Sequence, residues 1–232
     1  DFTLPKNREK SLHFTPKDLV IVGVPVYAGR VPNVLLKYLN NQLKAQNSLA
    51  VAVVVYGNRH YDDALIELKD ILQQNGFNTI AGAAFIGEHS FSKILAKNRP
   101  DSQDLKKVED FAQEIFNKLK NQNLKEVKVL GNPHFRNYYQ PKDKKGHNFD
   151  FKIIKPKTHA HCTNCKICVG VCPIGSIDYN NVAKLNSFCI KCGACVKNCP
   201  VSAKYFDDEN YLKHKHELEK NYSAKKEPEC FL

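Results

Sequence analysis

The sequence predicts an α/β protein in two parts. The first is an open, parallel sheet covered by helices, and the second is a small, cysteine-rich α+β domain. Two observations carry this prediction. Apolar, β-branched runs alternate with amphipathic helical patterns up to about residue 122. Eight of the nine cysteines then lie between Cys162 and Cys199.

Three runs predict the strands of the sheet, at Asp18–Val26, Leu49–Tyr56 and Asn78–Ile86. The first of them, DLVIVGVPV, is apolar without alternation, so we expect it to be buried on both faces. Strand and helix patterns that alternate three times favour parallel pairing. Val127–Leu130 is a candidate for a further short strand.

Three helical patterns lie between and after these runs. Pro32 and Asn33 open the first, and Asp62 or Asp63 is expected to cap the second, which Gly76 ends. Asp101 is expected to cap the third, long helix. Its apolar positions predict one packed stripe, formed by Leu105, Val108, Ala112, Ile115, Phe116 and Leu119.

Both cysteine segments have the form C-x2-C-x2-C-x3-C-P, at CTNCKICVGVCP (Cys162–Pro173) and CIKCGACVKNCP (Cys189–Pro200). Bacterial ferredoxins with two [4Fe–4S] clusters use this ligand pattern. Three closely spaced cysteines can direct their sulfurs at one cluster, while the fourth, followed by proline, leaves toward the neighbouring cluster. The predicted ligands of the first cluster are Cys162, Cys165, Cys168 and Cys199. Those of the second are Cys189, Cys192, Cys195 and Cys172.

Zinc is the rival metal, because paired CxxC units also bind it. Zinc sites require neither the third cysteine nor the repeated Cys-Pro, so the pattern favours iron–sulfur clusters. Cys230 lies outside the pattern in a charged segment, where we expect a free, exposed thiol. His214 and His216 are expected to be solvated rather than bound to metal.

Polar and aromatic groups follow the predicted strands, at residues 27–30, 56–62 and 87–91. In open parallel sheets, ligands bind beyond the carboxyl ends of the strands. These loops are therefore expected on one edge, where their glycines and aromatic rings suit a flat heteroaromatic ligand. Each group also has a structural alternative: Tyr27 and Tyr56 could cover the core, and Arg30 could pair with a nearby acid.

Three segments resemble flavodoxin-type FMN domains: VGVPVYAGRVPN (Val22–Asn33), VVVYGNRHYDDALIEL (Val53–Leu68) and FIGEHSFS (Phe85–Ser92). More narrowly, the chain resembles the "ferrodoxin" family, in which a flavodoxin-like domain is fused to a two-cluster ferredoxin. The resemblance implies an FMN site formed by Pro25, Tyr27, Ala28, Gly29, Arg30, Tyr56, Gly57, Asn58, Arg59 and Asp62. We therefore expect a partial flavodoxin-like domain (1–122), a linker (123–157) and the two-cluster domain (158–207). The charged tail (208–232) lies outside the resemblance, and its residues predict a polar helix over Asp208–Tyr222 that ends in disorder.

The chain departs from that family at its front. A flavodoxin begins with a strand and a loop of the form S/T-x-T-G-x-T that holds the FMN phosphate, and this sequence contains neither such a loop nor any methionine. We therefore expect a processed chain or a fragment without strand 1, which binds FMN weakly or not at all. In the strand order 2-1-3-4-5, this loss leaves the sheet with an exposed edge.

The formal charge is +11, with lysines spread over several segments rather than gathered on one aromatic-rich element. We therefore expect a solvated basic surface that steers redox partner proteins, including acidic ones, and neither nucleic-acid nor membrane binding. Clustered thiols and the lack of a visible export signal predict a soluble protein in the reducing cytoplasm.

These observations predict an electron-transfer protein that passes single electrons through two [4Fe–4S] clusters, coupled to FMN in the full-length protein. It would be a redox carrier or a component of an oxidoreductase rather than a substrate-transforming enzyme, because no proton-transfer or nucleophile–base pair stands out. Two alternatives stay open. One is a ferredoxin module whose flavin-free α/β half serves for docking, and the other is a zinc-dependent nucleic-acid-binding protein.

Overall fold

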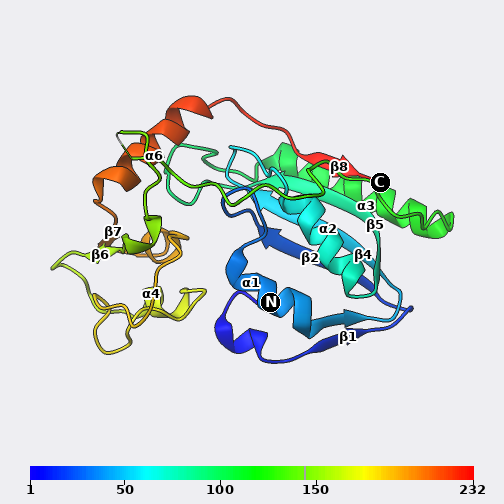
Figure 1. Cartoon of the computed structure of the whole chain (residues 1–232), viewed down its shortest axis with the longest axis horizontal. Coiled ribbons are helices and arrows are strands. Elements are labelled where there is room, and N and C mark those ends of the chain that lie inside the picture. The colour runs from blue at the N-terminus through cyan, green and yellow to red at the C-terminus, as the bar shows by residue number, and fades with distance from the viewer. Residues whose placement is uncertain (144) are drawn as a thin grey trace. The chain divides into compact units, whose positions relative to one another are not determined.

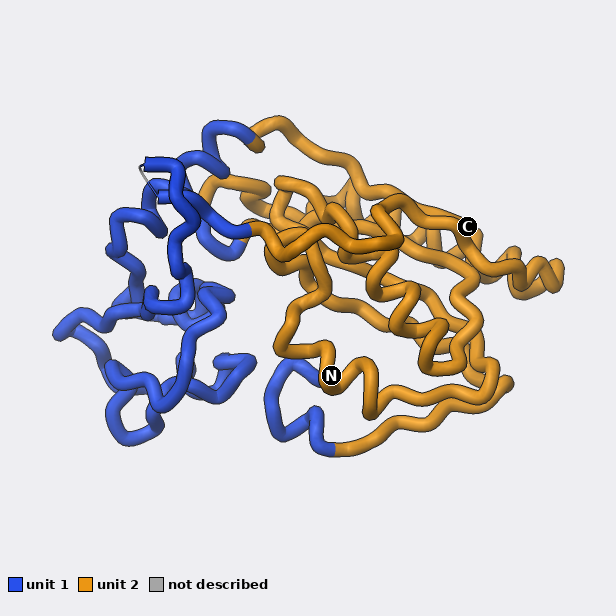
Figure 2. Tube along the Cα trace, in the orientation of Figure 1, with its two compact units in different colours: residues 1–9, 90–92, 140–221 blue, residues 10–89, 93–139, 222–232 orange. Residues whose placement is uncertain are grey.

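The computed structural model of the chain describes residues 1–143 and 145–232. Lys144, in the predicted linker, lies outside the described residues. The chain divides into two compact units, which Figure 2 colours separately. The α/β unit consists of residues 10–89, 93–139 and 222–232, and the cysteine unit of residues 1–9, 90–92 and 140–221.

The α/β unit is built on a four-stranded sheet with the order β2-β4-β5-β8 (Figure 1). These strands span Leu19–Pro25, Ser48–Tyr56, Phe77–Ile86 and Glu229–Phe231. The first three are parallel, in a register that sets Val22 opposite Ala52 and Val53 opposite Ala83. A separate parallel pair is formed by β1 (Leu12–Phe14) and β3 (Leu43–Ala45). The predicted parallel α/β sheet is confirmed.

The helices of this unit are α1 (Asn33–Gln42), α2 (Ala64–Gln74) and α3 (Ser102–Lys120). Figure 1 shows α2 on one face of the sheet and α3 on the other. Phe111 and Ile115 of α3 pack against Val51 of β4 and Ala83 of β5. Burial of such side chains contributes about 1.5–3 kcal/mol each, so the three-layer core stabilises the strand ends that carry the candidate flavin loops.

The strand β2 is less buried than its apolar sequence predicts. Its outer side pairs with no strand in the described part of the chain, and Ile21 is 66% exposed. The prediction that this run is buried on both faces is therefore wrong. The β-branched composition correctly predicted that a strand forms here. The burial of a strand also depends on which neighbours it has in the sheet.

The predicted apolar stripe on α3 is confirmed only in part, since Ile115 and Leu119 pack against the core as predicted. Phe111 and Ile115 are buried, whereas Leu105, Val108 and Phe116 are exposed, Phe116 to 59%. Helical periodicity shows which residues share a face. It does not show which of two neighbouring apolar stripes meets the sheet.

Of the predicted helix caps, Asp101 caps its helix and Asp63 does not. The Asp101 side chain accepts hydrogen bonds from the amides of Gln103 and Asp104, and this capping box confirms the predicted start of α3. Asp63 stands at the N-cap of α2 but makes no capping hydrogen bond. Its carboxylate instead accepts hydrogen bonds from the amides of Asn132 and Arg136. Asp63 therefore anchors a distant segment, and the predicted side-chain cap of α2 is wrong.

The last residues of the chain belong to the sheet. The strand β8 pairs with β5 in antiparallel orientation, with Cys230 opposite Ala83. Cys230 packs against the core cluster around Phe111 and is half-buried. The predictions of terminal disorder and of an exposed thiol are therefore wrong. Residues 127–130 form no strand, although the Val127 amide donates a 2.9 Å hydrogen bond to the Thr79 carbonyl.

The cysteine unit contains short elements around two loops (Figure 1). They are η1 (Pro5–Arg8), η2 (Phe151–Ile153), β6 (Lys157–Thr158), α4 (Ile167–Gly170), α5 (Ala194–Lys197), β7 (Lys204–Tyr205) and α6 (Glu209–Asn221). The strands β6 and β7 pair in antiparallel orientation. Within the described residues of the whole chain, no helix is both long and apolar enough to cross a bilayer.

Candidate metal centres

The two cysteine motifs adopt the same local structure. Each begins with a loop and enters a single helical turn, α4 in the first motif and α5 in the second. The residue before each turn has a left-handed backbone: Lys166 has φ = 65° and Gly193 has φ = 73°. This conformation reverses the chain tightly, so the cysteines on either side can face one common space.

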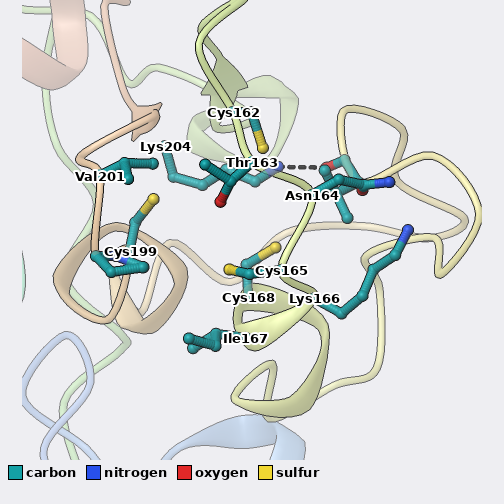
Figure 3. Close-up of a pocket in the computed structure, with 12 residues that line it drawn as sticks. Cys162, Thr163, Asn164, Cys165, Lys166, Ile167, Cys168, Cys199, Val201 and Lys204 are labelled. Atoms are coloured by element: carbon teal, nitrogen blue, oxygen red, sulfur yellow. Dashed lines mark hydrogen bonds between the residues drawn. The ribbon is translucent and has the colours of Figure 1, made fainter.

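The first cavity is completed by a cysteine of the second motif. Its lining includes Cys162, Cys165, Cys168 and Cys199. Figure 3 shows the sulfur atoms of these four cysteines turned toward the space between them. The sequence-predicted first set is thus brought together.

The second cavity is the counterpart of the first. Its lining includes Cys189, Cys192, Cys195 and Cys172. The Cys-Pro cysteine of each motif has therefore crossed to the other motif's cavity, as the predicted sets require. Most of the remaining lining is apolar, including Ile174, Ile177 and Phe206.

Backbone amides approach the sulfur atoms of the crossing cysteines. Ser176 N–H donates to Cys172 Sγ at 3.3 Å, and Ala203 N–H donates to Cys199 Sγ at 3.1 Å. In the second motif, Lys191 N–H also donates to Cys189 Sγ at 3.3 Å. Hydrogen bonds to sulfur stabilise its negative charge and tune the potential of an iron–sulfur cluster.

Burial makes four of these eight thiols harder to ionise. It raises the pKa of Cys168, Cys189 and Cys192, and it raises the pKa of Cys195 to about 12. For Cys199, burial acts in the same direction, but amide hydrogen bonds from Lys204, Ala203 and Val201 outweigh it, and its pKa is lowered. A metal must therefore displace protons from the four thiols with a raised pKa, so metal loading releases protons.

The spacing of the sulfurs favours a cluster over a single ion. Zinc holds its thiolates about 2.3 Å from one centre. Among the described residues, no three His, Cys, Asp or Glu side chains are gathered closely enough to hold one metal ion. Each set of four cysteines instead surrounds a shared space, and thiolates arranged in this way suit a polynuclear iron–sulfur cluster.

Aromatic side chains adjoin the second cavity, and sequence reasoning missed the central one. The ring of Tyr211, on α6, stacks on Phe206 with centroids 4.5 Å apart and lies 4.9 Å from Phe91. Burial raises the pKa of Tyr211, and the nearby cysteines raise it further. His214 is 8% exposed in the same cluster, so its predicted solvation is wrong. The spacing of Tyr211, His214 and Leu218 on one helical face was a signal for this packing.

Two of the predicted flavin loops lie at the carboxyl ends of strands in the α/β unit. One follows Pro25 at the end of β2, and the other begins at Tyr56, the last residue of β4. Arg30 donates two 2.7 Å hydrogen bonds to the buried carboxylate of Glu67. Its guanidinium also lies over the rings of Phe135 and Tyr138. The structural alternative for Arg30, pairing with a nearby acid, is therefore the arrangement found.

The loop after β4 is also engaged with protein groups. Asn58 donates hydrogen bonds of 2.6 and 2.9 Å to the carbonyls of Tyr222 and Ala224. Arg59 pairs with Asp62. A Cβ on Gly57 would come within 2.6 Å of the His89 side chain. The polar groups assigned to FMN therefore satisfy one another or the C-terminal segment.

The remaining residues of this set are placed by the same two loops. Ala28 and Gly29 form the turn between Tyr27 and Arg30, whose backbones exchange two 3.0 Å hydrogen bonds. A Cβ on Gly29, which has φ = +80°, would meet the Asp62 carboxylate. The two loops are thus packed against each other. Tyr56 is buried, and the centroid of its ring lies 5.7 Å from that of Tyr61.

Comparison with known families supports the iron–sulfur half of this picture. Residues 130–217 match the family described as a 4Fe-4S dicluster domain, and the match includes all eight motif cysteines. It does not reach the parallel strands. Searches of curated proteins and of solved structures found no match to the chain. The chain therefore carries an iron–sulfur region of the two-cluster class.

Proposed function

We propose that the chain is an electron-transfer protein that passes single electrons through two [4Fe–4S] clusters. The observation that carries this proposal is the pair of four-cysteine cavities, each completed by the Cys-Pro cysteine of the other motif. The first cluster would be held by Cys162, Cys165, Cys168 and Cys199. The second would be held by Cys189, Cys192, Cys195 and Cys172.

When bound, such clusters supply one-electron oxidation and reduction. The cysteines of the chain would hold the irons, and the groups around them would tune the potential. Ile174 and Ile177 give the second cavity apolar walls. The amides of Ser176 and Ala203 direct their hydrogens at cysteine sulfur and so favour the more negative, reduced state.

Anaerobic reconstitution with iron and sulfide tests this proposal. We expect about eight iron and eight inorganic sulfide atoms per chain, from two clusters of the four-iron type. C165A, which removes one proposed ligand, is expected to lose about half of the iron. C230A, which removes a cysteine outside both cavities, is the matched control and should keep all of it. Stoichiometric zinc without sulfide would overturn the proposal.

The finer proposal couples these clusters to FMN at the carboxyl ends of β2 and β4. Loops rich in glycine and aromatic residues at this edge of a parallel sheet support it. In the present chain, Arg30 and Asn58 already have protein partners, and we therefore expect weak FMN binding. Isothermal titration with FMN measures it. Tight, stoichiometric binding to these 232 residues would contradict this expectation.

The engaged loops also favour a second candidate, in which the α/β unit serves for docking. A chain extended at its N-terminus by a strand and a loop of the form S/T-x-T-G-x-T separates the two. Flavin that co-purifies with it would support FMN coupling, and clusters without flavin would support docking.

We further propose redox proteins with acidic surfaces as partners, because the chain carries a formal charge of +11. Electrostatic steering weakens as salt increases. The rate of electron transfer to an acidic acceptor should therefore fall with ionic strength. A rate independent of salt would argue against this class of partner.

A further inference from the structure

A buried lysine lies beside the first cavity. Lys204, on β7, is 2% exposed and forms part of the cavity lining. Its ammonium donates a hydrogen bond to the Val182 carbonyl, which is the dashed line in Figure 3. A buried ammonium group is costly unless it has such partners, so its position next to a set of thiols needs an explanation.

The second cavity has an isoleucine at the corresponding place. Lys204 follows Cys199 at the same separation at which Ile177 follows Cys172, and both residues line their cavities. Lys166, which also lines the first cavity, directly follows the second cysteine of its motif, as Gly193 does in the second motif. Among the described residues, no charged side chain lines the second cavity itself, although the buried Lys191 donates a hydrogen bond to the Cys189 carbonyl beside it. The two cavities thus differ in charge although their backbones match.

The charge of Lys204 is placed at the first cavity by geometry. Its side chain lines that cavity together with Cys168 and Cys199. Among the described residues that line the second cavity, Lys204 is absent. Lys204 therefore favours negative charge mainly in the first cavity.

A cluster gains one negative charge when it accepts an electron. A fixed positive charge in a site of low dielectric stabilises that reduced state, and net charge is one of the factors that set cluster potentials. We propose that Lys204 raises the reduction potential of the first cluster above that of the second, so that the first cluster is reduced first. This inference rests on the proposed two-cluster function.

Lys191 provides a comparison within the same unit. Like Lys204, it is buried, but it does not line either cavity. Its ammonium donates a 2.6 Å hydrogen bond to the Cys189 carbonyl and lies 5.5 Å from the centre of the Phe151 ring. Replacement of Lys191 removes a buried lysine without changing the charge of the first cavity's lining.

The test is a redox titration of the reconstituted full chain, followed by electron paramagnetic resonance. C192A isolates the first cluster and C165A isolates the second, and iron analysis should give about four atoms in each background. We expect a higher midpoint potential in C192A than in C165A. A lower one would overturn the proposal, even without any lysine variant.

K204M in the C192A background is expected to reduce the ratio of reduced to oxidised cluster at least tenfold at a fixed applied potential. This corresponds to a shift of about 59 mV for a one-electron couple. K204R, which keeps the charge, should restore most of the ratio. K191M should leave the potential of the first cluster unchanged.

Equal shifts of both clusters in K204M, or no shift of the first, would overturn the role of Lys204 while the proposed function stands. Failure of the wild-type chain to assemble any cluster would instead overturn the proposed function. Should K204M lose iron, K204Q provides a neutral, polar replacement, and the comparison of C192A with C165A still decides the order of potentials.

Discussion

The carbonyl oxygen of Ser90 occupies the place that a side chain on Gly193 would need, since a Cβ built on Gly193 would come within 2.6 Å of it. Gly193 also has a left-handed backbone, at φ = +73°. Ser90 and Gly193 both belong to the cysteine unit. The second motif therefore has no room for a side chain at Gly193.

G193A should therefore destabilise the reconstituted protein. The backbone conformation alone costs roughly 1–2 kcal/mol for a residue with a Cβ, and the contact with Ser90 adds to it. Urea titration of the cluster absorbance measures the change. G170A is the matched control, because a Cβ on Gly170 would meet nothing within 4 Å. Equal midpoints for the two variants would show that the Ser90 contact is not tight in solution.

Pairs of cysteine substitutions test the crossing of the motifs. C162A/C199A removes two proposed ligands of one cluster and should retain about four irons. C162A/C172A removes one proposed ligand from each cluster and should retain few or none. Iron and sulfide analysis after anaerobic reconstitution gives the answer. The reverse order would mean that each motif keeps its own fourth cysteine.

The α/β unit should lose stability in acid through Asp63. Burial alone would raise the pKa of Asp63, but amide hydrogen bonds from Arg136 and Asn132 and the charges of Arg136 and Arg30 outweigh it, and the pKa is lowered. A group with a depressed folded pKa stabilises the fold above its unfolded pKa, roughly 3.9. That contribution is lost as the pH falls through the lower, folded value.

D63N should flatten this part of the pH profile and reduce stability at neutral pH by about 1–3 kcal/mol, because an amide cannot accept both hydrogen bonds equally well. Denaturant unfolding from roughly pH 2 to 7, the range that covers the titration of such a carboxyl, measures both the pH profile and the stability at neutral pH. An unchanged slope in D63N would assign the acid sensitivity to other carboxylates.

Cys230 should react slowly with iodoacetamide in the native protein. Only the thiolate reacts, and burial raises the pKa of Cys230, which also packs against the core of the α/β unit. Peptide mass spectrometry of labelled protein, with and without urea, compares the rates. Equal rates in the two conditions would mean that β8 is open in solution.

Sequence reasoning succeeded where the pattern is local. Long β-branched runs predicted the three parallel strands. Ligand spacing predicted the two sets of cysteines that line the cavities, and their binding of clusters stays a prediction. It failed where a partner comes from afar. Asp63 was expected to cap its own helix but binds the amides of Asn132 and Arg136. The burial of Lys204 was not predicted, because nothing in its sequence neighbours shows that Val182 and a cysteine cavity surround it.

The position of β8 at the end of the chain affects the order in which the parts of the protein fold during synthesis. It lies after both cysteine motifs in the chain, yet it pairs with β5, which precedes them. On the ribosome, both motifs therefore emerge while the sheet still lacks this strand. Because domains tend to fold during synthesis, the cysteine ligands become available for iron delivery before the α/β unit is complete.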